Sequence, residues 1–147
     1  MSARDTAERV SDAKHRLGSD HDLWITTAAD GHPWLVPLSF HWNDEAVLMA
    51  TVRKSPTYRN LAAGGTARLA LGHTRDVLML DGEVDLPDRL ADADAEAVMS
   101  ASGYDPRTNA DTAYIRFVPR RAQAWRNVEE IEARTIMRDG QWAASTR

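Results

Sequence analysis

The stretch LWITTAADGHPWLVPLSFHWNDEAVLMAT, residues 23–51, decides the fold of this chain. It contains three segments rich in strand-forming residues: 23–27, 34–42 and 46–51. Turn-forming residues separate them, Asp30-Gly31 after the first segment and Asn43-Asp44-Glu45 after the second. Because short strands joined by tight turns pair with their neighbours, this stretch predicts an antiparallel meander.

The middle segment indicates how the meander lies in the molecule. Its residues alternate between an apolar face with Val36, Leu38, Phe40 and Trp42 and a second face with Leu35, Pro37, Ser39 and His41. Pro37 has no backbone N–H to donate to a neighbouring strand. We therefore expect this strand to lie at an edge of the sheet, to be bulged, or to face something other than a neighbouring strand.

The rest of the chain adds helices and strands to this meander. Helices are expected within residues 1–20, near 56–63 and near 88–102. Further strands are expected at 66–71, 76–86, 114–118 and 122–126, with a hairpin near 137–142. The predicted fold class is mainly β with peripheral helices, a single domain over residues 1–147 with an antiparallel, closed or partly open β-barrel over 23–142.

Composition excludes several kinds of protein. The 147 residues suit one domain, and no apolar run reaches the about 18 residues that would cross a membrane. Residues 1–16 are charged and lack the apolar core of a secretion signal, so we expect a cytoplasmic protein without membrane contact. The net charge of −4 disfavours nucleic acid as a partner. Cysteine is absent and the five histidines lack the spacing of a metal site, so no metal is expected.

The best candidate site is where the third strand runs into a helix that begins at Ser55. Free N–H groups at a helix start favour an anion, and the Thr51 and Ser55 hydroxyls add to them. Arg53 and Lys54 stand just ahead of this helix, and Lys54 is one of only two lysines against 16 arginines. Two interpretations stay open: a phosphate cradle, or a well-capped helix with two solvated cations.

No stretch identifies a catalytic residue. Motifs of serine hydrolases and nucleotide hydrolases are absent, and no pair of residues is recognisable as a catalytic acid and base. If a proton must be delivered, the candidates are His41, Tyr58 and His73.

Three stretches together resemble the pyridoxamine 5′-phosphate oxidase-like split barrels, a family that includes the deazaflavin (coenzyme F420)-dependent reductases. One is the strand 34–40, and the second runs from Thr51 through Ser55 to 59–61, similar to the family's Thr-x-x-x-Ser-x-Lys-x-x-x-Leu phosphate motif. The third is Trp125 with Arg134 and the residues up to 142. The resemblance covers roughly residues 23–142 and implies an antiparallel split β-barrel that is dimeric.

The resemblance also implies how a flavin-type cofactor is held. Thr51 and Ser55 would contact its phosphate, and the backbone of Val36, Pro37, Leu38 and Ser39 would face the polar edge of its ring. Trp125 and Arg134 would reach the cofactor from the partner subunit, so the implied assembly is a homodimer with the site at the subunit interface.

This sequence departs from the family motif after the serine. The oxidase motif has Arg-Lys there, and this chain has Pro56 and Thr57. We expect Arg53, Lys54 or Arg59 to supply the missing phosphate cations; the predicted cofactor set also includes Asn60. Ahead of Arg134 lie Ile131 to Ala133, with Glu129, Glu130 and Glu132 nearby, in the region where the oxidases carry an Arg and a His for the substrate phosphate. Since carboxylates repel a phosphate, a true pyridoxamine phosphate oxidase is not expected.

The resulting hypothesis is an oxidoreductase that transfers a hydride or electrons between its cofactor and an unidentified small molecule. FMN is the first choice of cofactor and F420 the alternative, since both carry a phosphate on a ribityl chain. The alternative function is a non-catalytic barrel that binds or carries a cofactor. The substrate is expected to depend on loops such as 104–111 and on the partner chain's surface.

Overall fold

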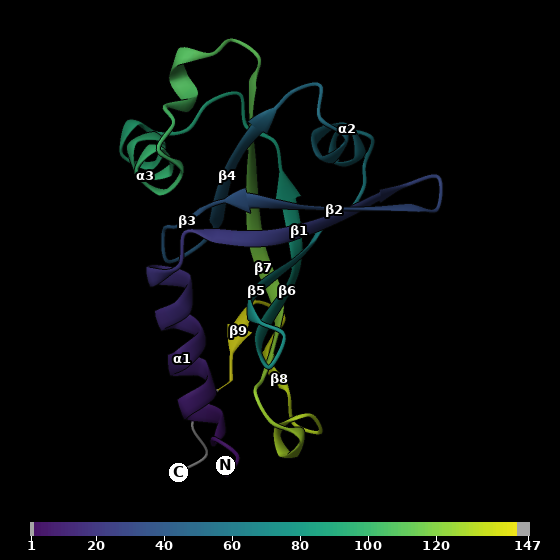
Figure 1. Ribbon diagram of the computed structural model, residues 1–147, viewed down its shortest axis with the longest axis vertical. Coiled ribbons are helices and arrows are strands. Elements are labelled where there is room, and N and C mark those ends of the chain that lie inside the picture. Colours follow the sequence, from purple (N-terminus) through teal and green to yellow (C-terminus); the bar gives the residue numbers. More distant parts are fainter. Residues whose placement is uncertain (1, 144–147) are drawn as a thin grey trace.

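The computed structural model describes residues 2–143, and one strongly curled antiparallel sheet runs through it (Figure 1). Its strands are β1 (Asp22–Ala29), β2 (His32–Ser39), β3 (His41–Trp42), β4 (Val47–Val52), β5 (Arg68–His73), β6 (Asp76–Asp85), β7 (Thr112–Trp125), β8 (Thr135–Arg138) and β9 (Gln141–Trp142). The order across the sheet is β2-β1-β5-β6-β7-β4-β3, and β8 joins β7 and β9. The protein is therefore mainly β, a split barrel.

Helices lie around this sheet. They are α1 (Thr6–Ser19), α2 (Pro56–Ala62) and α3 (Asp92–Ser102), with short 3-10 turns η1 (Pro106–Thr108) and η2 (Val128–Glu130). Figure 1 shows α1 beside the lower half of the barrel and α2 and α3 on opposite sides of its upper end. None of the helices in the described part of the chain is long and apolar enough to cross a membrane.

The meander predicted from residues 23–51 is confirmed only for its first hairpin. The predicted strand 34–42 is divided into β2 and β3, which lie at opposite ends of the strand order, and only β3 pairs with β4. β1 pairs with β2 along its whole length, and Asp30 at the connecting turn takes the positive φ of 52° that such tight turns require. β2 lies at an edge of the sheet, as the missing N–H of Pro37 predicts. β6 lies between β5 and β7, which agrees with its apolar first half.

The barrel interior is filled by side chains from nearly every strand. The residues with no exposed surface include Ile25, Phe40, Met49, Leu69, Leu80, Ile115, Phe117 and Ile136. α1 adds Val10, Ala13 and Leu17 to the same cluster. Burying a side chain of this size stabilises the fold by roughly 1.5–3 kcal/mol, so this cluster is the main source of stability.

Two further predicted elements differ from the structure. The expected strands 114–118 and 122–126 are one strand, β7, which continues through Pro119. Pro119 lies opposite Gly82 where the register of β6 and β7 shifts, and a bulge tolerates a residue without an N–H. A Cβ at Gly82 would lie 2.2 Å from the Val118 carbonyl oxygen, so only glycine allows this close approach.

The third helix also begins later than expected, at Asp92 and not at residue 88. The chain ahead of it is held in place by Leu90, which packs on a small cluster formed by Ala46, Leu48 and Val98. This tertiary contact overrides the helix-start signal that Pro87-Asp88 carries.

A buried ion pair joins the N-terminal segment to η2. Arg4 donates three hydrogen bonds to the Glu130 carboxylate at 2.7–3.0 Å, from its backbone N–H and from the guanidinium Nε and Nη2. The backbone N–H of Arg126 donates a fourth at 2.9 Å. The Glu130 side chain has no exposed surface and that of Arg4 has 5%. These hydrogen bonds from Arg4 lower the pKa of the Glu130 carboxyl to about 2.

We expect Glu130→Gln to destabilise the protein at neutral pH, by roughly 3–5 kcal/mol, because it leaves the buried Arg4 guanidinium with only the half-exposed Asp12 carboxylate, 2.9 Å away, as a counter-charge. The folded-state pKa of Glu130 lies below its ordinary value of 4.5. Its contribution is therefore complete above pH 4.5 and is lost as the pH falls towards 2.

Urea unfolding of the wild type and the variant between pH 7 and pH 2.5 measures this effect, and the difference should narrow below pH 4.5. Glu132→Gln, an exposed neighbour, is the control and should change little. An equal loss in both variants would contradict the prediction.

Candidate functional site

The hydroxyls of Thr51 and Ser55 lie together at the top of β4. Ser55 is the N-cap of α2: its hydroxyl accepts from the backbone N–H of Tyr58 at 3.2 Å, and Pro56 occupies the first turn. The Thr51 hydroxyl donates to the Ser55 oxygen at 3.4 Å. The predicted helix start is thus confirmed, and the structure places the two predicted phosphate contacts side by side.

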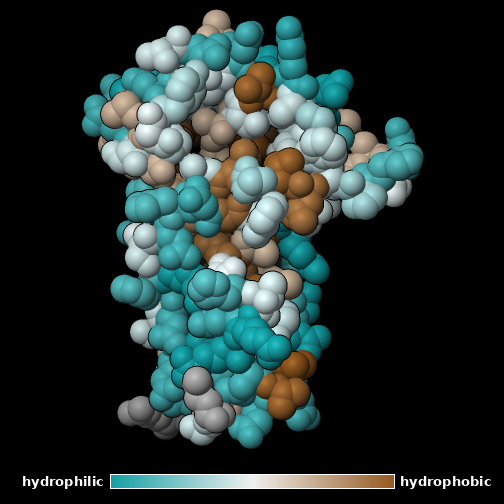
Figure 2. Space-filling view, viewed as in Figure 1, coloured by the Kyte–Doolittle hydropathy of each residue, from teal (hydrophilic) through white to brown (hydrophobic). Residues whose placement is uncertain are grey.

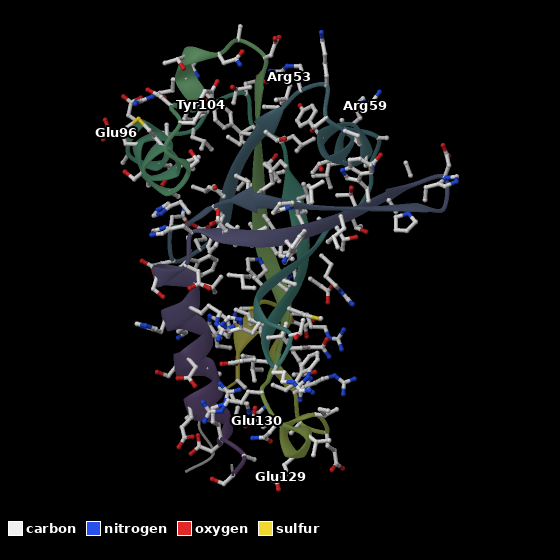
Figure 3. The ribbon with its side chains drawn as sticks, viewed as in Figure 1. Arg53, Arg59, Glu96, Tyr104, Glu129 and Glu130 are labelled. Carbon is white, nitrogen blue, oxygen red and sulfur yellow. The ribbon has the colours of Figure 1, made fainter. Side chains whose placement is uncertain are left out.

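Cationic residues flank this hydroxyl pair in the chain: Arg53 and Lys54 precede Ser55, and Arg59 follows it. The Arg53 guanidinium donates to the Thr112 carbonyl at 3.2 Å and lies over the Tyr58 ring, 5.7 Å from its centroid. Lys54 and Arg59 are exposed. Figure 3 shows Arg53 and Arg59 near the same end of the molecule. Three cations are therefore available where the family motif would place two at positions 56 and 57.

Asn60, also in the predicted set, has a different contact. Its side-chain amide donates to the Thr27 hydroxyl of β1 at 3.1 Å. This hydrogen bond docks α2 on the sheet.

The predicted ring-facing segment is the second half of β2. Val36 and Leu38 pack against the core cluster, whereas Pro37 is exposed on the other face. β1 is the strand with which β2 pairs in the described structure, so its second edge has backbone groups that are free for a ligand. Ser39, at the end of the strand, donates from its hydroxyl to the Asp22 carboxylate at 2.9 Å.

A cavity of about 400 Å³ joins the two predicted stretches. Ser39 and Thr51 both line it. The rest of its lining comes from β4, β7, α3 and the loop after α3: Ala50, Val52, Thr112, Val98, Ser102, Tyr104 and Asn109. A cavity of this size can hold a small organic ligand.

The sequence did not indicate which residues of α3 and of the loop after it would line the cavity. Loop 104–111 was expected to influence the substrate, and Tyr104 and Asn109 fall within it. Val98 and Ser102 carry no sequence signal beyond helical spacing, because their role depends on how α3 packs against β4.

Trp125 and Arg134 lie together at the opposite end of the molecule. The Arg134 guanidinium is 5.9 Å from the centroid of the Trp125 ring. β7 runs from Thr112, beside the cavity, to Trp125, a path of about 40 Å at the usual rise of a strand. Within one chain these residues therefore cannot reach the Ser55 hydroxyl.

The three candidate proton donors are scattered. His41 pairs with Leu48 of β4 and is half-buried, and Tyr58 lies in the first turns of α2 under Arg53. His73 is exposed at the end of β5 that pairs with Asp76, near the Trp125 end of the sheet. None of the three lines the cavity.

The acidic residues ahead of Arg134 divide into two kinds. Glu130 is buried and paired with Arg4, so its charge is neutralised within the chain. Glu129 and Glu132 are exposed. The repulsion of a phosphate expected here therefore rests on these two residues.

Apolar side chains also gather on the outer face of β1 and β2. Trp24 is 48% exposed and Leu35 60%, and Pro37 lies opposite Trp24 on the same face. Figure 2 shows hydrophobic residues in the middle of the visible surface, where β1 and β2 cross the molecule in Figure 1. A shallow hollow of about 300 Å³ lies beside it, lined by Trp24, Pro37 and Ala70 among others. Exposed apolar surface on an edge hairpin is typical of a contact with another protein.

The half-open barrel and its strand order define the split-barrel fold, and a cavity large enough for a small ligand lies at the end of β2. The sequence matches the pattern of the pyridoxamine 5′-phosphate oxidase family over residues 12–126. The chain belongs to this family, and the resemblance seen in the sequence is confirmed. No curated protein matches the sequence closely.

Solved structures share the fold at low sequence identity. A FAD-binding protein from Mesorhizobium loti superposes with a TM-score of 0.63 at 16% identity, covering 77% of this chain and 89% of that one. An F420 reductase superposes with a TM-score of 0.63 at 19% sequence identity, covering 74% of this chain and 94% of that one. A heme-binding protein from Mycobacterium smegmatis superposes with a TM-score of 0.68 at 17% sequence identity, covering 95% of this chain and 60% of that one. One fold thus serves proteins with different cofactors.

Proposed function

We propose that this protein binds a flavin-type cofactor, FMN or alternatively F420, and acts as an oxidoreductase on a small molecule. The observation that carries the proposal is the convergence of Ser39 and Thr51, from the two stretches that resemble the family's cofactor contacts, on one cavity. The Thr51 and Ser55 hydroxyls beside it suit a phosphate.

The residues present fit such a cofactor. Arg53, Lys54 and Arg59 can neutralise a phosphate at the start of α2, and the free edge of β2 can hydrogen-bond the polar edge of a ring. When bound, a flavin or deazaflavin supplies hydride or electron transfer. The protein binds and orients it and keeps water away. His41 and Tyr58 are the nearer candidates for holding a proton, since His73 belongs to the far end of the sheet.

A homodimer with the site at the subunit interface follows from the same proposal. Trp125 and Arg134 can contact the cofactor only from a second copy, given the length of β7. Support comes from the apolar outer face of β1 and β2, where Trp24 and Leu35 are exposed. We propose a cytoplasmic protein whose partners are a second copy and a small-molecule substrate.

The cofactor proposal is tested by the absorption spectrum and mass of what copurifies with the protein, repeated after soaking with FMN and with F420. Binding of either supports it, and failure to bind both overturns it. Turnover with small-molecule acceptors then separates an enzyme from a carrier, in which a reduced cofactor would be reoxidised only slowly.

The double variant Lys54→Ala, Ser55→Ala should weaken binding of the retained cofactor at least tenfold, because it removes one cation and one hydroxyl from the cradle. Fluorescence titration measures the affinity. Losing a helix cap alone costs about 1 kcal/mol of stability.

The matched control is Lys14→Ala with Asp5→Ala, which removes the other lysine and the N-cap of α1. Unchanged cofactor affinity in the Lys54, Ser55 variant would place the phosphate elsewhere.

Leu35→Glu should convert the dimer to monomers and weaken cofactor binding, because it puts a charge in the centre of the apolar outer face. Light scattering coupled to gel filtration gives the mass. His32→Glu, an exposed residue at the hairpin tip, should leave the dimer intact. A wild-type monomer that binds cofactor fully would refute the shared site.

The purified, flavin-loaded protein should not oxidise pyridoxamine 5′-phosphate. The exposed carboxylates Glu129 and Glu132 lie ahead of Arg134, and no cation lines the cavity. Formation of pyridoxal 5′-phosphate, followed by absorbance, is the measurement. Sustained turnover would show that this expectation is wrong.

A further inference from the structure

The cavity has two walls of different origin. The strand wall, from β2, β4 and β7, carries the residues assigned above to the cofactor. The second wall consists of Val98, Ser102, Tyr104 and Asn109, from α3 and the loop that follows it. Figure 3 shows Tyr104 between α3 and the upper end of β4. We define these four residues as the α3 wall.

No side chain that lines this cavity is charged at neutral pH. A carboxylate or phosphate group placed against the α3 wall would gain no counter-charge from the lining, and Ser102, Tyr104 and Asn109 are themselves exposed to solvent. The strand side of the cavity is less exposed, so an anion that enters it loses hydration without an ion pair in return, and the lining selects against anions.

The chain around the α3 wall makes an anion still less favourable. Residues 91–112 contain five acidic residues, Asp92, Asp94, Glu96, Asp105 and Asp111, and one basic residue, Arg107. Arg107 is already engaged, because its guanidinium donates twice to the Asp105 carboxylate at 3.0 and 3.2 Å. The cations of the cradle belong to the other side of the site, at the start of α2.

The α3 wall does offer neutral hydrogen-bond donors. The Ser102 hydroxyl donates to the Val98 carbonyl at 3.0 Å, and the Asn109 side-chain oxygen accepts from the backbone N–H of Asp111 at 2.8 Å. The Asn109 NH2 group and the Tyr104 hydroxyl have no hydrogen-bond partner among the described residues. Val98 and the Tyr104 ring supply apolar surface between these groups.

We infer that the α3 wall binds an uncharged, ring-sized organic molecule that carries a carbonyl or hydroxyl group, and that it rejects carboxylates and phosphates. Its ring packs on Val98 and Tyr104, and its oxygen takes hydrogen bonds from Tyr104 or Asn109. That this molecule is the substrate rests on the proposed function; that it binds here rests on the cavity alone.

Two probes with the same ring test this. 2-Acetonaphthone and 2-naphthoate differ by a methyl group in place of a carboxylate oxygen, so they compare a neutral with an anionic ligand of nearly equal shape. Calorimetric titration of the full-length protein, as purified, should show the ketone binding at least tenfold more tightly. Equal affinities, tighter binding of naphthoate, or no binding of either probe would overturn the inference.

A charge introduced on the α3 wall locates the binding. Ser102→Lys should increase naphthoate affinity at least fivefold and reduce the preference for the ketone. Ser100 lies on the same helix but does not line the cavity. Ser100→Lys should therefore change neither the naphthoate affinity nor the preference for the ketone. Both changes put a cation near the C-terminal end of α3, where the helix dipole favours it. Equal effects of the two variants would overturn the inference, because the charge would then act through solvent.

Titration with FMN and F420 in parallel separates this inference from the proposed function. If the protein discriminates between the probes but binds neither cofactor, the inference about the α3 wall is supported and the cofactor proposal is refuted. If the protein binds a cofactor but does not discriminate between the probes, only the inference about the α3 wall is refuted.

Discussion

The length of β7 is the constraint on which the rest of this structure depends. This strand pairs with β4, β6 and β8, and it passes without a break through Pro119. It thereby holds the cavity at one end of the molecule and the Trp125–Arg134 pair at the other. A proline in mid-strand is tolerated because the bulge opposite Gly82 needs no N–H there.

Charge is distributed unevenly around the cavity. The cations Arg53, Lys54 and Arg59 lie at the start of α2, whereas the segment from α3 to β7 is strongly acidic. The lining between them is neutral. Charges attract or repel a ligand over some distance, and burial penalises an ion that has no partner nearby. The α2 side and the α3 side of the cavity therefore favour different ligands. An anionic group is suited to the α2 side and an uncharged group to the α3 side.

Local signals predicted the elements whose cause is local. Pro37 predicted an edge strand because it lacks a donor, and Ser55-Pro56 predicted the start of α2 because the serine hydroxyl can cap it. The misplaced start of the third helix has a non-local cause, the packing of Leu90 on Val98. The buried pair of Arg4 and Glu130 joins residues 126 positions apart, so no local pattern could indicate it.

The sequence by itself determined the fold class, the family and the helix start at Ser55, because alternation, turns and caps depend on neighbouring residues. It also placed Trp125 and Arg134 in the resembled motif. Only the tertiary structure decided that these two lie far from the cradle in one chain, and that Val98 and Ser102 face Thr51 across a cavity. Those relations depend on how a long strand curls and how a helix packs, which are set by contacts between residues distant in the chain.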